Sequence, residues 1–177
     1  GELVATIRPA RPPQPLVLVE RGPRLAHAMR AVVAHLAPEI GERELETVCK
    51  RLNWERGTVS SIETTDSPGN FVEARVCFAN VTELATSIGE RDRAAERVGQ
   101  YCADAMCRYL RATAPVGEYL LDQLLVPLAL TAGGELRAIR WTPHAEAQRQ
   151  LLRTWFERDI EVERGDTGVR VTFPRMS

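Results

Sequence analysis

The sequence predicts a fold that combines α-helices and β-strands, of the α/β or α+β class. Strand-like segments are interspersed with amphipathic helical segments along the 177 residues, and this alternation is typical of those two classes. A turn sequence separates two neighbouring strands at 66–70, "DSPGN", which holds the Pro and Gly that tight turns need. The chain is long enough for one large hydrophobic core or two small ones.

Strands are predicted where apolar and polar residues alternate or where short β-branched runs occur. The predicted strands are residues 2–8, 16–22, 57–63, 71–78 and 135–141, followed by a hairpin within 159–173 whose turn carries Asp-Thr-Gly. The segment 24–36 is ambiguous, because Leu25, Met29 and Val32 have helical spacing whereas "AVVA" favours a strand. The proline-rich connector "PARPPQP" joins the first two strands.

Helices are predicted where apolar residues recur every three or four positions. The clearest case is the segment 39–52, whose inward positions are Ile40, Leu45, Val48 and Leu52. Further helices are predicted at 92–112, 117–126 and 143–157.

The composition is that of a globular protein without a strong electrostatic bias. Apolar residues make up 44% of the chain and charged residues 27%, and the net charge is −1. Any contact with nucleic acid therefore has to come from a local patch. No apolar run has the length needed to cross a bilayer, and no secretory signal is visible, so we expect no membrane association.

The cysteines and histidines lack the spacing of zinc ligands. Because no C-x-x-C pair occurs, we expect free thiols in a reducing, cytoplasmic compartment. The residues concerned are Cys49, Cys77, Cys102, Cys107, His27, His35 and His144.

A polar stripe interrupts the apolar segment "PVGEYLLDQLLVPLAL" at residues 115–130. On a helix with about 100° per residue, Glu118, Tyr119, Asp122 and Gln123 share one face, opposite the leucines. A solvated face is the simplest interpretation. Two features favour a binding site instead. Like charges at i,i+4 mildly destabilise a helix, and a tyrosine beside Asp and Gln suits an aromatic base and its ribose.

His144 is the histidine with a local argument for chemistry. Thr142 is placed to cap a helix and Pro143 to occupy its first position, so His144 falls in the first turn. The positive end of the helix dipole there favours a neutral ring, whose nitrogen can act as a base, metal ligand or nucleophile. The structural alternative is a satisfied residue at the edge of the core, because His144 shares a side with Leu151 and Trp155.

Taken together, the two sites resemble the C-terminal signature of the RNA 3'-terminal phosphate cyclases. The resemblance is carried by "VGEYLLDQLLVPLALTAGGE" (116–135) and the histidine at 144. It extends through "RYLRATAPVGEY", "SPGNFVEARV" and "VERG" to "GELVAT" at the start of the chain. It covers essentially all 177 residues, and the GEYLxDQL stretch is specific.

The resemblance implies an ATP-dependent conversion of an RNA 3'-terminal phosphate into a 2',3'-cyclic phosphate. Members of the family adenylate a histidine, which matches His144, and pass AMP to the RNA 3'-phosphate. AMP leaves when the neighbouring 2'-OH attacks. The implied ATP-binding residues are Tyr119, which would stack on adenine, Leu120, Leu121, Asp122 and Gln123. The implied metal is Mg²⁺ or Mn²⁺, held partly by Asp122, which would neutralise the leaving pyrophosphate.

The resemblance also implies an α+β fold, an α/β sandwich. Family members contain repeats of a four-stranded sheet with two helices, similar to the C-terminal domain of a bacterial translation initiation factor, and a smaller α/β domain is inserted into the last repeat. On this sequence, residues 1–11 and 113–177 would form the repeat unit and 12–112 the insert. On that basis, the segment 24–36 contains a strand.

Two departures from the family pattern bear on activity. The family reads His-x-x-Thr-Asn after its nucleophile, whereas this chain has Ala147 and Gln148 in the last two places. The chain also matches only the C-terminal half of the family, and "GELVATIRP" begins inside an apparent strand without an initiator methionine, which indicates a piece of a longer chain. We therefore expect an incomplete site that needs the N-terminal half, in cis or in trans, to act on RNA 3'-phosphate ends.

A second hypothesis is a catalytically inactive, cyclase-like scaffold in RNA processing or ribosome assembly. The presence of His144 favours the enzyme, whereas the missing Thr and Asn favour the scaffold.

Overall fold

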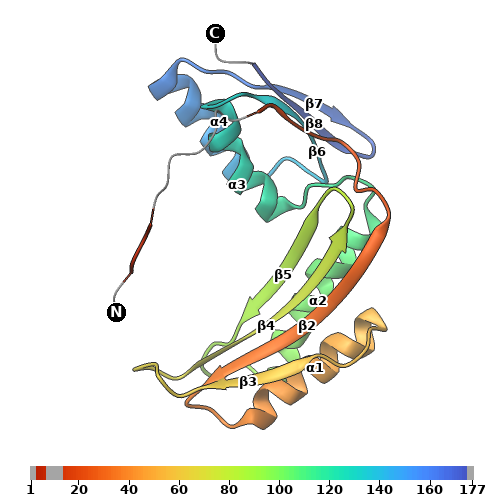
Figure 1. Cartoon of the computed structure of the whole chain (residues 1–177), viewed down its shortest axis with the longest axis vertical. Helices are drawn as coiled ribbons and strands as arrows, with labels where there is room; N and C mark the ends of the chain where they lie inside the picture. Colours follow the sequence, from red (N-terminus) through yellow and green to blue (C-terminus); the bar gives the residue numbers. More distant parts are fainter. Residues whose placement is uncertain (1–2, 7–13, 175–177) are drawn as a thin grey trace.

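The computed structural model describes residues 3–6 and 14–174 as two four-stranded sheets, each covered by two helices (Figure 1). This confirms the predicted α+β fold. The elements are β1 (Leu16–Leu18), β2 (Arg24–Ala34), α1 (Pro38–Leu52), β3 (Thr58–Ile62), β4 (Gly69–Phe78), β5 (Thr82–Ile88), α2 (Ala95–Arg111), α3 (Glu118–Ala129), β6 (Gly134–Ala138), α4 (Pro143–Phe156), β7 (Glu161–Gly165) and β8 (Gly168–Phe173).

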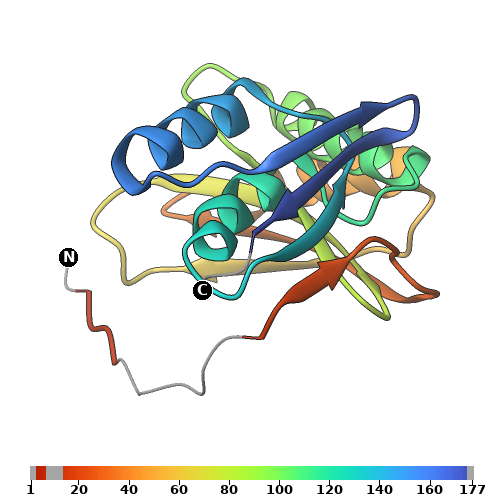
Figure 2. The same ribbon diagram turned by 90° about the horizontal axis from the view of Figure 1, so that it is seen from above.

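The C-terminal unit consists of β1 and the elements from α3 to β8. Its sheet has the order β1-β6-β8-β7, and β1 runs parallel to β6, beside which it lies in Figure 2. Parallel neighbours need a crossover connection, and α3 is the helix of that crossover. A hydrophobic core lies between the sheet and its two helices, with Leu121, Leu125, Leu136, Leu152 and Val171 among its members.

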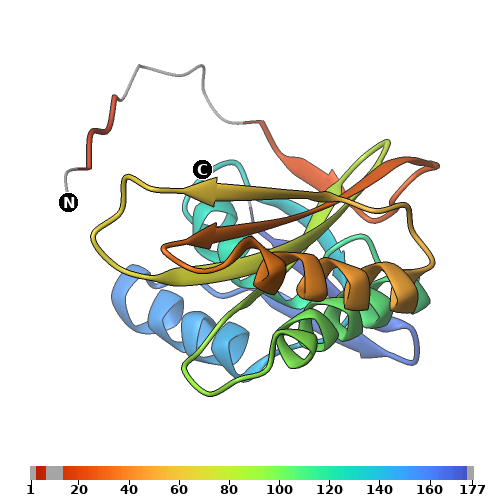
Figure 3. The same ribbon diagram turned by 90° about the horizontal axis from the view of Figure 1, so that it is seen from below.

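The inserted unit consists of the elements from β2 to α2. Its sheet has the order β3-β2-β4-β5, and α1 and α2 lie side by side on one face (Figure 3). The ambiguous segment is strand β2, because Met29, Ala31 and Val33 alternate into the core under the helices. Helices α1 and α2 confirm the predictions for 39–52 and 92–112.

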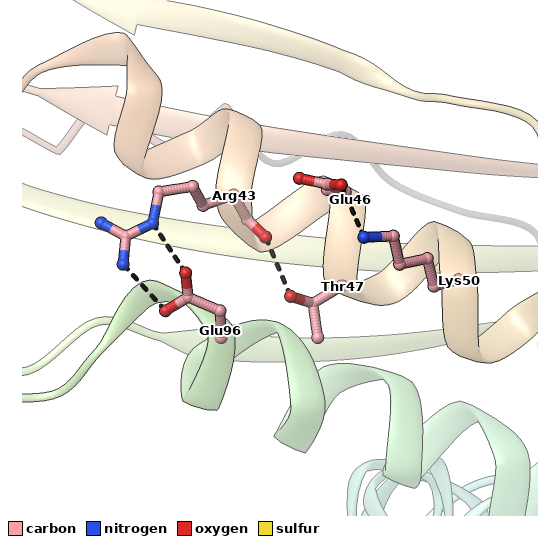
Figure 4. Close-up of polar contacts among 5 residues, drawn as sticks. All are labelled: Arg43, Glu46, Thr47, Lys50 and Glu96. Carbon is pink, nitrogen blue, oxygen red and sulfur yellow. Dashed lines mark hydrogen bonds and ion pairs between the residues drawn. The ribbon is translucent and has the colours of Figure 1, made fainter.

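Close packing, with ion pairs at its rim, joins α1 to α2. A Cβ at Gly99 would lie 2.5 Å from the carbonyl oxygen of Glu44, so only glycine allows this approach. Arg43 of α1 forms a two-pronged contact with Glu96 of α2, at 2.7 and 2.9 Å (Figure 4). Because both side chains are about half exposed, this pair contributes little to stability, and apolar burial holds the helices together.

The structure corrects several boundaries. Strand β5 was not predicted, and the strand predicted at 16–22 covers only Leu16–Leu18. Residues 3–6, within the strand predicted at 2–8, form no strand. Residues 1–2 and 7–13, with the two ends of that predicted strand and most of the connector, lie outside the described residues. Strand β1, which pairs with β6 in the C-terminal sheet, lies within the range 12–112 that was predicted for the insert.

The four cysteines are free thiols, as predicted. Among the described residues, no helix combines the length and the apolar character needed to span a membrane.

Leu125→Ala tests the core of the C-terminal unit. Leu125 of α3 is fully buried, so its truncation leaves a cavity and we expect a loss of about 2–5 kcal/mol in the free energy of unfolding, measured by urea denaturation. Leu151→Ala is the matched control, because Leu151 is 55% exposed and should cost less than about 1 kcal/mol. Equal losses in the two variants would contradict this assignment of the core.

A buried carboxyl group lies at the centre of the inserted unit. Glu44 of α1 has no exposed surface, and one of its oxygens accepts a hydrogen bond from Asn70 Nδ2. The other oxygen, Oε2, has no partner among the described residues. Burial raises the pKa of Glu44 to about 7, against the lowering effect of the Asn70 hydrogen bond, so the folded state favours the protonated acid.

Glu44→Gln should reduce the pH dependence of stability. In the unfolded chain this carboxyl ionises near its ordinary pKa of 4.5, whereas in the folded state it keeps its proton up to about pH 7. Stability from this group is therefore complete at acidic pH and is lost as the pH rises toward 7. Urea denaturation at about pH 5 and about pH 8 should show a decline for the parent chain and a smaller one for Glu44→Gln. Glu63→Gln, an exposed control, should keep the parental decline; an unchanged decline in Glu44→Gln would disprove the role of Glu44.

Candidate functional site

The site is built on the first two turns of α3, which begins after Gly117. Leu121, Leu125 and Leu128 face the core, and the four polar residues of the predicted stripe lie on the other side, with Tyr119 and Gln123 exposed and Glu118 and Asp122 half-buried. The predicted division of the helix into an apolar and a polar face is confirmed.

The two carboxylates of the stripe have separate partners on the segment that joins β6 to α4. Glu118 forms an ion pair with Arg140 at 2.5 Å, and Asp122 Oδ1 accepts a hydrogen bond from Thr142 Oγ1 at 2.9 Å. These partners offset the repulsion expected between like charges one turn apart. Part of the stripe is therefore structural, because it holds the start of α4 against α3.

Thr142 connects the stripe to the helix that carries His144. Its hydroxyl donates to Asp122 and also accepts the backbone N–H of Ala145 at 2.9 Å, so it is the predicted N-cap, with Pro143 at the first helical position. His144 lies in the first turn and is exposed. Asp122 of α3 is therefore hydrogen-bonded to a residue that lies two positions before His144.

Tyr119 lies at the boundary between the two units. Its side chain is 68% exposed and lines a small cleft together with Ile139 and, from the inserted unit, Met106, Arg108 and Tyr109. A ring that is exposed beside a cleft can stack on a planar ligand.

The remaining stripe residues contribute differently. Gln123 is exposed and makes no side-chain hydrogen bond within the described part of the chain, so its amide can reach a ligand. Leu120 is half-buried, and Leu121 is fully buried in the core. The side chain of Leu121 therefore packs into the core, and the ATP-binding role expected for this residue stays a prediction.

A junction network that sequence reasoning missed holds the two units together. Arg21, which follows β1, donates through Nε to the carbonyl of Ala114 at 2.8 Å and packs 3.8 Å above the centre of the Tyr109 ring. Tyr109 Oη donates to the carbonyl of Pro115 at 2.8 Å. Burial lowers the pKa of Arg21 and raises the pKa of Tyr109 to about 12, so the Tyr109 hydroxyl keeps the proton that it donates to Pro115.

Glu83 of β5 is a further residue that was missed. Its side chain is buried, and Oε2 accepts the backbone N–H of Gly117 at 3.3 Å. Burial raises its pKa to about 7, while the Gly117 hydrogen bond and the charge of Arg21 act in the opposite direction. A signal existed in the sequence, because Glu83 shares the inward face of "TELATSI" with Ala85, where a charged residue is out of place.

The residues present would hold a divalent ion only together with a bound ligand, whose own oxygens would supply most of the metal coordination. Among the described residues, no group of three or more His, Cys, Asp or Glu side chains could hold a metal. The second oxygen of Asp122 has no hydrogen-bond partner there, and one carboxylate with phosphate oxygens is a common arrangement for Mg²⁺. On α4, Gln148 Oε1 is buried and has no partner among the described residues; it lies one turn beyond His144 on the same side.

Comparison with known proteins gives similarity over nearly the whole chain. The profile described as "RNA 3'-terminal phosphate cyclase (RTC), insert domain" matches residues 19–111. The RNA 3'-terminal phosphate cyclase of Ralstonia nicotianae is 36% identical over 174 residues, which are 97% of this chain and 50% of that protein. Those of Koribacter versatilis and Salmonella typhimurium are 33% and 32% identical, over 97% and 81% of this chain and 49% and 42% of theirs. This chain spans about half the length of the relatives it matches.

Thr142→Val tests the link between α3 and α4. The substitution keeps the shape of the side chain but removes both hydrogen bonds of the hydroxyl, so we expect a loss of about 1–3 kcal/mol in the free energy of unfolding. Thr154→Val removes an exposed hydroxyl from the same helix and should cost less than about 1 kcal/mol. Equal costs, measured by urea denaturation, would mean that the Thr142 hydroxyl does not hold the two helices together.

Proposed function

The chain belongs to the RNA 3'-terminal phosphate cyclase family, and on that premise we propose that it is the C-terminal, nucleotide-binding part of an ATP-dependent cyclase. The proposed reaction converts an RNA 3'-terminal phosphate into a 2',3'-cyclic phosphate, with His144 as the nucleophile that carries AMP.

One observation carries the proposal: the hydrogen bond from Thr142 to Asp122. It joins the helix of the polar stripe to the first turn of the helix of His144, so a nucleotide on one helix would lie next to the nucleophile on the other. The exposed ring of Tyr119 offers the stacking surface for adenine, and Gln123 offers an amide to the polar groups of the nucleotide.

The chemistry divides one difficult condensation into three substitutions at phosphorus. A ring nitrogen of His144 attacks the α-phosphorus of ATP, and pyrophosphate leaves. An oxygen of the RNA 3'-phosphate then attacks the phosphorus of the His144-bound AMP, which frees the histidine and forms an activated RNA end. Finally, the neighbouring 2'-OH loses its proton and attacks the 3'-phosphorus, and AMP leaves with the electrons of the broken bond.

The residues of this chain contribute mainly to positioning in this scheme. The first-turn location of His144 exposes its ring to a ligand, and the Thr142 cap fixes the turn. Mg²⁺ or Mn²⁺ would supply charge neutralisation at the phosphates, with Asp122 as the one carboxylate ligand from the stripe. Gln148, in place of the family asparagine, is one turn from His144, and its buried Oε1, which has no partner among the described residues, would accept a hydrogen bond from a ring N–H.

The other half of the cyclase is the proposed partner, in cis or in trans. The relatives are about twice as long as this chain, and their remaining half would supply contacts to RNA and to phosphates. An exposed apolar cluster near the end of α4 fits such packing; it consists of Leu151, Trp155 and Phe156, exposed by 55%, 74% and 52%.

Intact mass after incubation with ATP and Mg²⁺ or Mn²⁺ tests the nucleophile. We expect a gain of one AMP on the parent chain and none on His144→Ala. The two other histidines, His27 and His35, contact Trp54 and Thr65 of the inserted unit and not the polar stripe of α3. His35→Ala is the matched control, an exposed histidine far from α3 in sequence, and should label like the parent. Tyr119→Phe should keep labelling, since the ring remains, whereas Tyr119→Ala should need at least about tenfold more ATP.

Labelling of His144→Ala to the parental level would disprove the assignment of the nucleophile. If the parent gains AMP only after the N-terminal half of a relative is added, the site in this chain alone is incomplete, but the assignment of His144 as the nucleophile is supported. If no adduct forms with that half present, the inactive scaffold becomes the better description of this chain.

A further inference from the structure

The inserted unit contributes a buried carboxyl group to the start of α3. Glu83 lies on β5 and its partner Gly117 immediately precedes α3, so their hydrogen bond crosses from one unit to the other. Gly117 is the N-cap of α3 and has no side chain with which to cap the helix itself. The Glu83 carboxylate therefore meets the positive end of α3, where a negative charge is favourable.

The space at Gly117 is shaped by Glu83. A Cβ at residue 117 would lie 2.0 Å from Glu83 Oε1 and 2.5 Å from its Cδ. Its φ of −73° is open to any residue, so the requirement for glycine comes from the neighbouring carboxyl group and not from backbone strain. The two residues form a matched pair.

Three charged or titratable groups surround this pair. Arg21 from the segment after β1 and Tyr109 from α2 interact electrostatically with Glu83, as does Glu118 from α3. Arg21 favours the ionised carboxylate, whereas Glu118 disfavours it. Glu83 also lines the same cleft as Tyr119, two residues beyond Gly117.

Resting on the proposed function, we propose that Glu83 is a positioning residue of the nucleotide site: by holding the N–H of Gly117 it fixes the first turn of α3 and, with it, the ring of Tyr119. The inserted unit thereby takes part in nucleotide binding without touching the nucleotide. Loss of the Glu83 contact should weaken ATP binding and leave the reactivity of bound ATP toward His144 nearly unchanged.

Hydrogen exchange read by mass spectrometry tests the contact itself, and it needs no activity. In Glu83→Ala, the amides of the first turn of α3 should exchange about tenfold faster than in the parent, the factor expected for one lost hydrogen bond. The β7–β8 hairpin, in the other part of the C-terminal unit, should exchange at the parental rate, and Glu55→Ala, an exposed control in the inserted unit, should change neither segment. Glu83→Gln, which keeps an acceptor oxygen, should give a smaller increase and serves as the readout if Glu83→Ala unfolds.

The matched pair allows a double-mutant test. Gly117→Ala should displace the carboxyl group and accelerate exchange of the first turn about as much as Glu83→Ala. The double variant should be no faster than either single one, because the added methyl group then occupies the vacated space. Additive acceleration, or no acceleration in Glu83→Ala and Glu83→Gln, would overturn the proposal.

The ATP concentration dependence of His144 labelling tests the consequence for the nucleotide site. Glu83→Ala should raise the half-saturating ATP concentration about tenfold while the maximal labelling rate stays within about twofold of the parent. A loss of maximal rate at unchanged half-saturation would overturn the positioning role. If the parent itself forms no adduct under any condition, the proposed function fails, while the exchange experiment still decides whether Glu83 holds α3.

Discussion

The parallel pairing of β1 with β6 is the constraint on which the rest of the molecule depends. Leu16 lies opposite Gly134, and a Cβ at Gly134 would lie 2.0 Å from the carbonyl oxygen of Leu16, so the two strands meet in this register only with glycine there. The whole inserted unit lies between these paired strands in the sequence. The chain must therefore leave the C-terminal sheet and return to it at one edge, which brings the end of α2 close to Arg21 and sets the location of the junction network.

This closure explains why the boundary between the units is polar and hydrogen-bonded. Arg21 and Tyr109 donate to carbonyl groups of the segment that leads into α3. Glu83 accepts the backbone N–H of Gly117, the residue immediately before the helix. Buried polar groups of this kind are costly when unpaired and directional when paired. They define one geometry for the start of α3, whereas an apolar interface would allow the two units to slide against each other.

The candidate site combines structural and functional roles in the same short helix. Glu118 forms an ion pair with Arg140, and Asp122 accepts a hydrogen bond from Thr142. Tyr119 and Gln123 remain exposed on the same face. The structural pair orients the helices, and the exposed pair is available to a ligand. A solvated face and a binding site were competing interpretations of the stripe. The contacts of Glu118 and Asp122 give these two residues a supporting role, and a role of Tyr119 and Gln123 in recognition belongs to the proposed function.

Local signals in the sequence determined the helices and their polar and apolar faces. The Thr142 cap, the first-turn position of His144 and the stripe of α3 all depend on residues within one or two turns of each other, so spacing alone predicts them. The tertiary structure decided the features that depend on distant partners. They include the strand character of Arg24–Ala34, which burial under two helices imposes, and the membership of β1 in the C-terminal sheet. They also include the contacts of Asp122 with Thr142 and of Glu83 with Gly117, because a hydrogen bond between residues far apart in the chain leaves no periodic pattern in the sequence.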